Sequence, residues 1–185
     1  MTKHVAFIRA INVAGHGIVK MSTLRAAFQR AGGSDVSTFI QSGNVLFEAP
    51  AHDAAGIVRR VESELRSVLG SEPKIMLRTT REIEALVKST PFKDFGATQD
   101  VKLYVAFLSR TPSIQPRLPL ISSKEALEAV RMNNREVFIV SRPKESGFFG
   151  FPNNFIEEQL HVSATSRNWS TVTKIANLAR SQRDG

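Results

Sequence analysis

The chain has 185 residues and a mass of 20.4 kDa, with 42% hydrophobic residues and no cysteine. This length allows one domain or two small ones, with a core large enough to fold without metals or disulfides. The lack of cysteine excludes disulfide frameworks, cysteine-ligated zinc, iron–sulfur clusters and thiol catalysis.

Basic residues outnumber acidic ones, with 25 Lys and Arg against 17 Asp and Glu, a formal net charge of +8 and a pI near 10.3. This balance favours polyanionic partners or small anionic ligands, although a charge that only keeps the surface soluble has the same signature. No stretch reaches the roughly 20 apolar residues of a membrane span, and the first apolar run breaks at Arg9. We therefore expect a cytoplasmic protein with no membrane partner.

The first half of the chain has the pattern of strand, helix, two strands, helix, strand and helix. Short β-branched and aromatic runs predict the strands, and apolar residues three to four apart predict the helices. Strands are expected at residues 5–11, 36–40, 45–47 and 75–77, and helices with apolar stripes over residues 21–31, 58–68 and 83–87.

Local signals mark the ends of these elements. Ser22 is expected to cap the first helix and Gly70 to end the second. Gly43 fits a tight turn between the second and third strands. Thr79 and Glu82 have the spacing of a capping box, which predicts the start of the third helix.

The second half repeats part of this pattern. A strand is expected at residues 101–108, a hairpin from residues 125–132 and 136–141, a short helix after Pro152 and a final helix capped by Asn168. The segment Val5-Ala6-Phe7-Ile8 is nearly identical to Val105-Ala106-Phe107-Leu108, which suggests a duplication. Both segments are apolar on both faces, so we expect both faces to be covered, which argues against an open RNA-binding sheet.

The order β-α-β-β-α-β is that of the ferredoxin-like, or split βαβ, arrangement. We therefore predict an α+β fold of two ferredoxin-like halves (α/β plaits) in tandem with a C-terminal helix. The first half is expected to span residues 1–93 and the second residues 100–185, joined by a linker at 94–99, where Gly and polar residues interrupt both periodicities.

Four segments carry a family resemblance, residues 9–15, 38–47, 105–109 and 164–172. Their most specific motifs are Gln41-Ser42-Gly43-Asn44 and Arg167-Asn168-Trp169. Through these segments the chain resembles the domain of unknown function (DUF) family 1697 over nearly its whole length. The resemblance implies a bacterial cytosolic protein with two ferredoxin-like halves, and it implies no activity, cofactor or catalytic residue.

The chain departs from the family pattern in two segments. The family usually has glycine, lysine or proline in the loop where this chain has Ala10, Ala14, His16, Ile18 and Lys20. A family segment rich in Gly, Arg, Ser and Lys is replaced by residues 147–151, a glycine-phenylalanine run. A ligand that these segments hold elsewhere in the family is therefore not implied here.

The predicted topology places the loop after the first strand beside the hairpin between strands two and three. Candidate ligand-binding residues at this edge are Arg9, Asn12, Lys20, Ser42, Gly43 and Asn44. Glycines, backbone amides, a helix start and cations together can form an anion site. The alternative is structural, with the asparagines holding loops, Gly43 fitting a turn and Arg9 paired with a carboxylate.

A second candidate cluster lies at the start of the final helix. Its members are Arg167, Asn168, Thr171 and Lys174. Hydroxyl and amide groups in the first turn of a helix can bind an anion or simply complete a cap. The structural alternative is a capped helix with Trp169 packed inward.

The remaining motifs predict no catalytic or metal chemistry. The four histidines lack metal-ligand spacing, and no phosphate-binding, nucleophile-elbow or dinucleotide motif occurs, so we expect no metal and no cofactor. The run Phe148-Phe149-Gly150-Phe151 is expected to be buried between the halves, with a partner-binding patch or base stacking as alternatives.

These observations favour a protein that binds an anionic ligand at a loop edge, either nucleic acid or a phosphorylated small molecule, with nucleic acid slightly ahead. One alternative is an enzyme on a small anionic substrate, with arginines as charge clamps. Another is a homodimeric interaction module, because exposed sheet edges and the phenylalanine run could be covered by a second copy.

Overall fold

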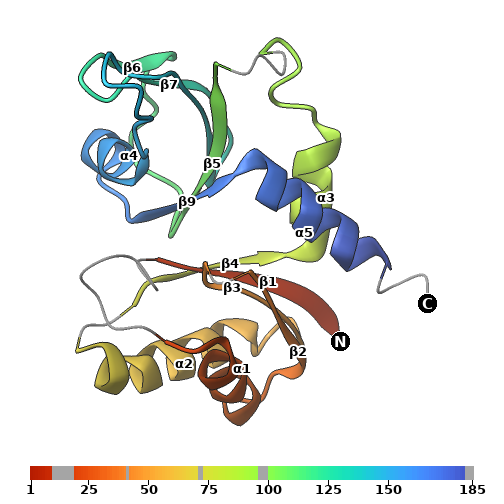
Figure 1. Ribbon diagram of the computed structural model, residues 1–185. Coiled ribbons are helices and arrows are strands. Elements are labelled where there is room, and N and C mark those ends of the chain that lie inside the picture. Colours follow the sequence, from red (N-terminus) through yellow and green to blue (C-terminus); the bar gives the residue numbers. More distant parts are fainter. Residues whose placement is uncertain (10–18, 41, 71–72, 96–99, 182–185) are drawn as a thin grey trace. The chain divides into compact units, whose positions relative to one another are not determined.

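The computed structural model describes residues 1–9, 19–40, 42–70, 73–95 and 100–181. These residues form two antiparallel sheets and five helices (Figure 1). The chain divides into two compact units, Met1–Ile83 and Glu84–Gly185.

The first unit is built on a sheet with the strand order β2-β3-β1-β4. Its elements in chain order are β1 (Thr2–Ile8), α1 (Met21–Arg30), β2 (Ser34–Phe39), β3 (Asn44–Ala49), α2 (Ala54–Leu69) and β4 (Ile75–Thr79). Both helices cover the same face of the sheet (Figure 1), where they pack on Ala6, Ile8 and Phe47. Val5 and Phe7 on the opposite face are just as fully buried. This order of elements is the predicted one.

The prediction that Ser22 caps α1 is wrong. The helix begins at Met21, so the N-cap residue is Lys20, whose side chain makes no capping hydrogen bond. Met21 already packs on the helix-covered core together with Leu24. Burying this apolar stripe requires the helix to begin one residue before the best local cap, because core packing outweighs a cap worth about 1 kcal/mol.

Three local predictions are confirmed. Gly70 ends α2 with a left-handed φ of 68°, and Gly43 adopts φ 70° in the β2–β3 turn. At the start of α3 (Thr80–Lys88), the Glu82 N–H donates to Thr79 Oγ1 at 3.1 Å and the Thr79 N–H donates to Glu82 Oε2 at 2.6 Å. These hydrogen bonds form the capping box expected from the sequence spacing.

The second unit contains a sheet with the strand order β6-β7-β8-β5-β9. Its strands are β5 (Lys102–Leu108), β6 (Leu120–Ser122), β7 (Leu127–Met132), β8 (Glu136–Ser141) and β9 (Ala164–Asn168). Its helices are α4 (Asn153–Leu160), which packs on a core that includes Ala106 and Ile139, and α5 (Trp169–Ser181). The sequence predicted neither β6 nor β9. Residues 109–119 between β5 and β6 contain no helix, so the second unit lacks the helix that follows the first strand in the first unit.

The two units repeat the same strand register. Val5 of β1 pairs with Arg78 of β4, and Val105 of β5 pairs with Arg167 of β9. A helix follows directly after each of these edge strands. Each unit therefore places an arginine at the same position, one residue before its strand ends.

Residues after α3 belong to the second unit. The buried Phe92 packs edge-on against Phe138 of β8 and Trp169 of α5, with ring centroids 5.7 and 5.3 Å apart. The division between the units falls within α3, after Ile83. The linker expected at residues 94–99 stays a prediction, because residues 96–99 lie outside the described residues.

The expectation that the phenylalanine run is buried is wrong for two of its three rings. Phe148 is 76% exposed and Phe151 is 56% exposed. The physical reason is a tight turn closed by Gly147 at φ 78°, which turns the backbone into a small hairpin and places Phe148 near its tip.

His4 of β1 is a buried histidine in the core of the first unit. Its ring stacks on Phe47 with centroids 5.4 Å apart, and neither ring nitrogen has a hydrogen-bond partner among the described residues. Burial lowers the pKa of His4 below its ordinary value of 6.5, while the Ala49 backbone and the Glu82 carboxylate offset part of this effect.

We expect His4 to make stability depend on pH. At a pH below 6.5 the unfolded chain binds a proton at His4 that the folded chain binds less readily, so the free energy of unfolding falls with falling pH. The slope from this group is at most about 1.4 kcal/mol per pH unit. Urea unfolding at about pH 7.5 and at about pH 5.5 measures the effect. Between these two values, the free energy of unfolding of His4→Phe should fall less than that of the native chain. An equal slope in His4→Phe and in the native chain would contradict the assignment.

Candidate functional site

The first candidate site lies where β1 ends. The Arg9 N–H donates to the Lys74 carbonyl at 2.8 Å, which continues the β1–β4 register beyond the pair of Ile8 and Ile75. Arg9 and Lys74 are therefore cross-strand neighbours. On the other side of β1, the Ile8 N–H donates to the Gly43 carbonyl at 2.9 Å. We call Arg9, Ser42, Gly43, Asn44 and Lys74 the sheet-edge cluster.

Within this cluster, Asn44 holds the turn. Its side chain is fully buried, and Nδ2 donates to the Phe39 carbonyl at 3.0 Å and to Ser42 Oγ at 2.8 Å. These bonds tie the end of β2 to the start of β3 around Gly43. Asn44 therefore has the structural role, and the half-exposed Ser42 is the polar side chain that the turn presents.

The cluster brings two cations together on one face of the sheet. Cross-strand neighbours share a face, and side chains alternate between faces along a strand. Ile8 and Ile75 lie on the helix-covered face, so Arg9 and Lys74 lie on the opposite face. Two cations on one face of a sheet raise the local concentration of anions beside them.

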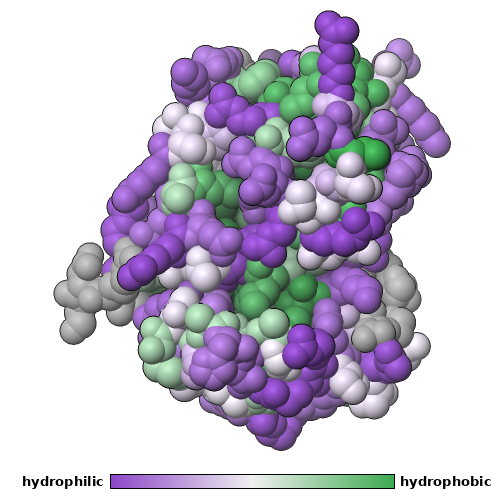
Figure 2. Space-filling model, turned by 180° about the vertical axis from the view of Figure 1, so that it is seen from behind, coloured by the Kyte–Doolittle hydropathy of each residue, from purple (hydrophilic) through white to green (hydrophobic). Residues whose placement is uncertain are grey.

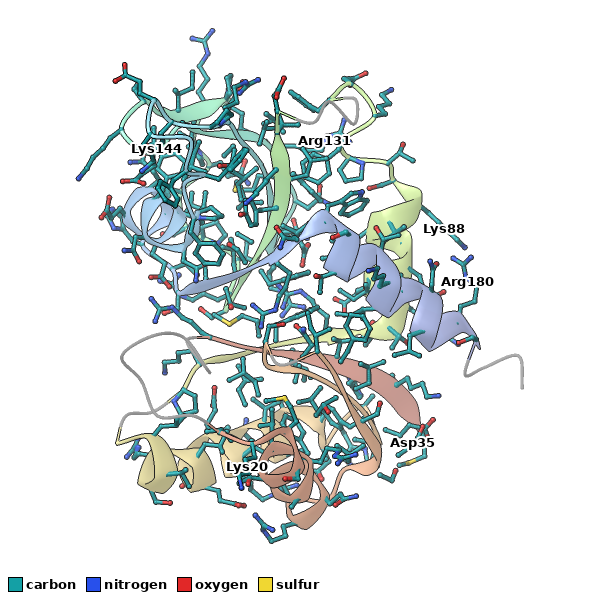
Figure 3. All side chains as sticks on the ribbon, in the orientation of Figure 1. Lys20, Asp35, Lys88, Arg131, Lys144 and Arg180 are labelled. Carbon is teal, nitrogen blue, oxygen red and sulfur yellow. The ribbon has the colours of Figure 1, made fainter. Side chains whose placement is uncertain are left out.

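Three further residues belong to the account of this edge. Lys20 is exposed at the start of α1 (Figure 3), and its carbonyl accepts the Leu24 N–H at 3.1 Å. Asn12 lies outside the described residues. On α2, Glu62 accepts the Ile75 N–H at 2.8 Å, so this carboxylate is engaged at the outer edge of β4.

Lys74 was not among the sequence-predicted residues. It directly precedes the strand that was expected at residues 75–77. The predicted topology pairs that strand antiparallel with the first one, so the residue before one strand faces the residue after the other. Because the first strand was expected to reach residue 11 and β1 ends at Ile8, this rule alone would have placed Lys74 opposite Asn12, and only the observed register pairs it with Arg9.

The second candidate cluster separates into a buried and an exposed part. Arg167 is buried, and its Nη1 donates to Thr165 Oγ1 and to the Ser166 carbonyl, both at 2.8 Å. Burial lowers the pKa of Arg167 to about 10, which leaves the side chain charged at neutral pH. These contacts give Arg167 a structural role within the second unit.

The other three residues of this cluster follow Arg167 in sequence. Asn168 is exposed at the end of β9, directly before α5 begins. Thr171 is half-buried and Lys174 is exposed in the first turns of α5. The structure therefore brings these three together through one helix end, while Arg167 is held inside the fold.

Arg78 is the counterpart of Arg167 that sequence reasoning missed. It is almost completely buried, and its Nη1 donates to the Leu77 carbonyl at 2.8 Å. In each unit the arginine thus contacts the carbonyl of the residue before it. The sequence holds no signal for this pairing, because the strand that carries Arg167 was not predicted.

The comparisons with known proteins place the chain in a family. The family model described as "Protein of unknown function (DUF1697)" matches residues 1–138. The chain belongs to the DUF1697 family. Among solved structures, this DUF1697 protein is similar to the conserved bacterial protein SP0830 from Streptococcus pneumoniae. That similarity has 16% identity and a TM-score of 0.61 and covers 95% of this chain and 97% of that one, and it shows a shared fold alone. No curated protein matches the chain.

Two other kinds of site are absent from the part of the chain that the structure describes. No three His, Asp or Glu side chains there gather closely enough to hold a metal ion. None of the helices in the described ranges combines the length and the apolar composition that a membrane span requires.

Proposed function

We propose that this DUF1697 protein binds an anionic ligand at the sheet-edge cluster, with Arg9 and Lys74 as the paired cations. The hydrogen bond from the Arg9 N–H to the Lys74 carbonyl carries the proposal, because it sets two cations across from each other on one face. On the other side of β1, Ser42 and Gly43 form a turn that carries no large side chain and no negative charge. Cations beside a glycine turn are typical of phosphate recognition.

The ligand classes are a nucleic-acid backbone and a phosphorylated small molecule, and nucleic acid is the preferred one. A net charge of +8 spread over the chain favours a partner that carries many negative charges. The family resemblance supports action in a bacterial cytoplasm, with which the lack of cysteine is compatible.

We expect Arg9→Ala and Lys74→Ala each to weaken oligonucleotide binding roughly three- to tenfold, without changing which sequences are preferred. Each cation that contacts a phosphate releases about one counterion, so each variant should also lower the slope of log affinity against log salt by about one. Fluorescence anisotropy of a labelled single strand, titrated at several salt concentrations, measures both quantities. Lys93→Ala, which removes an exposed lysine of the other unit, is the matched control and should keep the native affinity and slope.

Binding that ignores salt, or Arg9→Ala and Lys74→Ala variants that bind like the native chain, would overturn the proposal. A thermal-shift screen with inorganic phosphate, nucleotides and oligonucleotides separates the ligand classes. A shift from a small phosphorylated compound that survives high salt would favour the enzyme alternative. A dimer in sedimentation without any ligand response would favour the interaction module.

We also propose that both units are ferredoxin-like (α/β plait) folds in tandem, the second having residues 109–119 and β6 in place of its first helix. The equal register of Val5 with Arg78 and of Val105 with Arg167 supports this. Backbone chemical shifts test it: helical shifts within residues 109–119 would contradict the replacement.

A further inference from the structure

An unusual surface of the second unit is the segment of residues 143–151, which we call the aromatic hairpin. Pro143 and Phe149 form an antiparallel bridge, and the Lys144 N–H donates to the Phe148 carbonyl at 2.9 Å. The Gly147 N–H closes the turn by donating to the Lys144 carbonyl at 2.8 Å. The hairpin therefore has a defined backbone with an aromatic residue on its outgoing arm.

Side chains and backbone of the second unit brace the hairpin. Gly150 lies so close to the Glu125 backbone that a Cβ would stand 2.1 Å from the Glu125 carbonyl oxygen. Ser141 Oγ donates to the Gly150 carbonyl at 3.1 Å, and Lys144 forms an ion pair with Glu125 at 2.6 Å (Lys144 is labelled in Figure 3). The aromatic rings are thus presented from a fixed frame, which lowers the entropy lost on binding.

The rings on this frame are exposed. Phe148 is 76% exposed, and Phe151 is 56% exposed although its ring packs edge-on against Tyr104, with centroids 5.7 Å apart. The face shown in Figure 2 is mostly hydrophilic, with separate apolar patches. Two large apolar rings left in water within four residues of each other, on a braced hairpin, mark a contact surface.

A cation lies against one of the rings of the hairpin. Lys102 is exposed, with Nζ 4.4 Å from the centroid of the Phe149 ring. The carboxylates of Glu125 and Glu128 are each held in an ion pair, by Lys144 and Arg142 respectively. Glu145 is the acidic residue of the hairpin itself, and the chain as a whole carries a net charge of +8.

We infer that the aromatic hairpin binds single-stranded nucleic acid, with unpaired bases stacked on Phe148 and Phe151 and the backbone near Lys102. Exposed aromatic rings beside cations are the combination that single-strand binding proteins use, since every base offers a face for stacking. The inference goes beyond the proposed anion site, because it concerns another surface in the other unit and a different kind of contact. Each can fail without the other.

The test compares two labelled oligomers of about 12 units, an oligothymidine and an abasic strand with the same phosphates. The native chain should bind the oligothymidine more tightly. Phe148→Ala should weaken that binding roughly five- to hundredfold and leave abasic binding unchanged, because only stacking is lost. Phe148→Trp should keep the native affinity, whereas Phe148→Leu should behave like Phe148→Ala, since it is apolar without a ring.

Ile121→Ala is the matched control, since Ile121 is an exposed apolar residue of β6 in the same unit. It should bind both oligomers like the native chain. Equal native affinity for the two oligomers, or equal effects of Phe148→Ala and Ile121→Ala, would overturn the inference. So would a native dimer that Phe148→Ala converts to a monomer without changing oligothymidine binding, which would assign the surface to a second copy.

The same assay separates this inference from the sheet-edge proposal. Arg9→Ala should weaken binding of both oligomers by the same factor, because it removes a phosphate contact. If Arg9→Ala has no effect while Phe148→Ala weakens oligothymidine binding alone, the sheet-edge proposal fails and the aromatic hairpin stands. The reverse pattern overturns the hairpin and leaves the sheet-edge site.

Discussion

Phe92→Ala is expected to lower the free energy of unfolding by about 3–5 kcal/mol, the cost of truncating a buried phenylalanine. The Phe92 side chain is buried against the rings of Phe138 and Trp169, so its removal leaves a cavity between β8 and α5. Trp169 is the single tryptophan of the chain. Urea unfolding followed by tryptophan fluorescence therefore reports on the site of the substitution, and circular dichroism gives the loss of secondary structure in parallel.

Two variants serve as controls for this result. Phe92→Leu keeps most of the buried volume, so its free energy of unfolding should fall clearly less than that of Phe92→Ala. Phe95→Ala changes a half-exposed phenylalanine three residues later and should cost about 1 kcal/mol or less. If Phe92→Ala and Phe95→Ala unfold at the same urea concentration, the segment after α3 does not belong to the core of the second unit.

Arg167→Ala is expected to lower the free energy of unfolding by about 3 kcal/mol. The substitution leaves Thr165 Oγ1 and the Ser166 carbonyl without the donor that each has at 2.8 Å, and it removes a long buried side chain. Each buried polar group that loses its partner costs about 1–3 kcal/mol. Thermal unfolding and urea unfolding at neutral pH, where the arginine is charged, measure the loss.

The size of the replacement side chain tests this explanation. Arg167→Met keeps much of the volume and removes the buried charge, so it should be less destabilising than Arg167→Ala. Arg180→Ala removes an exposed arginine of α5 (Figure 3). Its free energy of unfolding should stay within about 0.5 kcal/mol of the native value. Equal stability of Arg167→Ala and Arg180→Ala would show that the buried contacts contribute nothing.

Predictions from the sequence succeeded where the signal is local. The capping box of Thr79 and Glu82 and the turns at Gly43 and Gly70 depend on residues within a few positions of each other. Their geometry follows from backbone conformation and from hydrogen bonds that short segments make for themselves. The order of elements in the first unit was predictable for the same reason, since hydrophobic periodicity is read within a window of a few turns.

The errors arose where packing between distant residues decides. Ser22 has the right side chain for a cap, but the buried stripe that includes Met21 and Leu24 sets the start of the helix. Phe148 belongs to an apolar run that composition alone would bury. Its exposure follows from a hairpin braced by Glu125, a contact across more than twenty residues that no local pattern contains.

For this DUF1697 protein, the sequence by itself determined the family, the order of elements in the first unit and the excess of positive charge. Only the tertiary structure decided which polar residues are accessible, because burial depends on strand pairing and packing over the whole unit. It set Lys74 opposite Arg9 at the sheet edge, and it buried Arg167 while leaving Phe148 in water. The residues proposed to contact a ligand are thus accessible because of strand register and packing. Neither the hydrophobic pattern nor the net charge shows which single residues will be accessible.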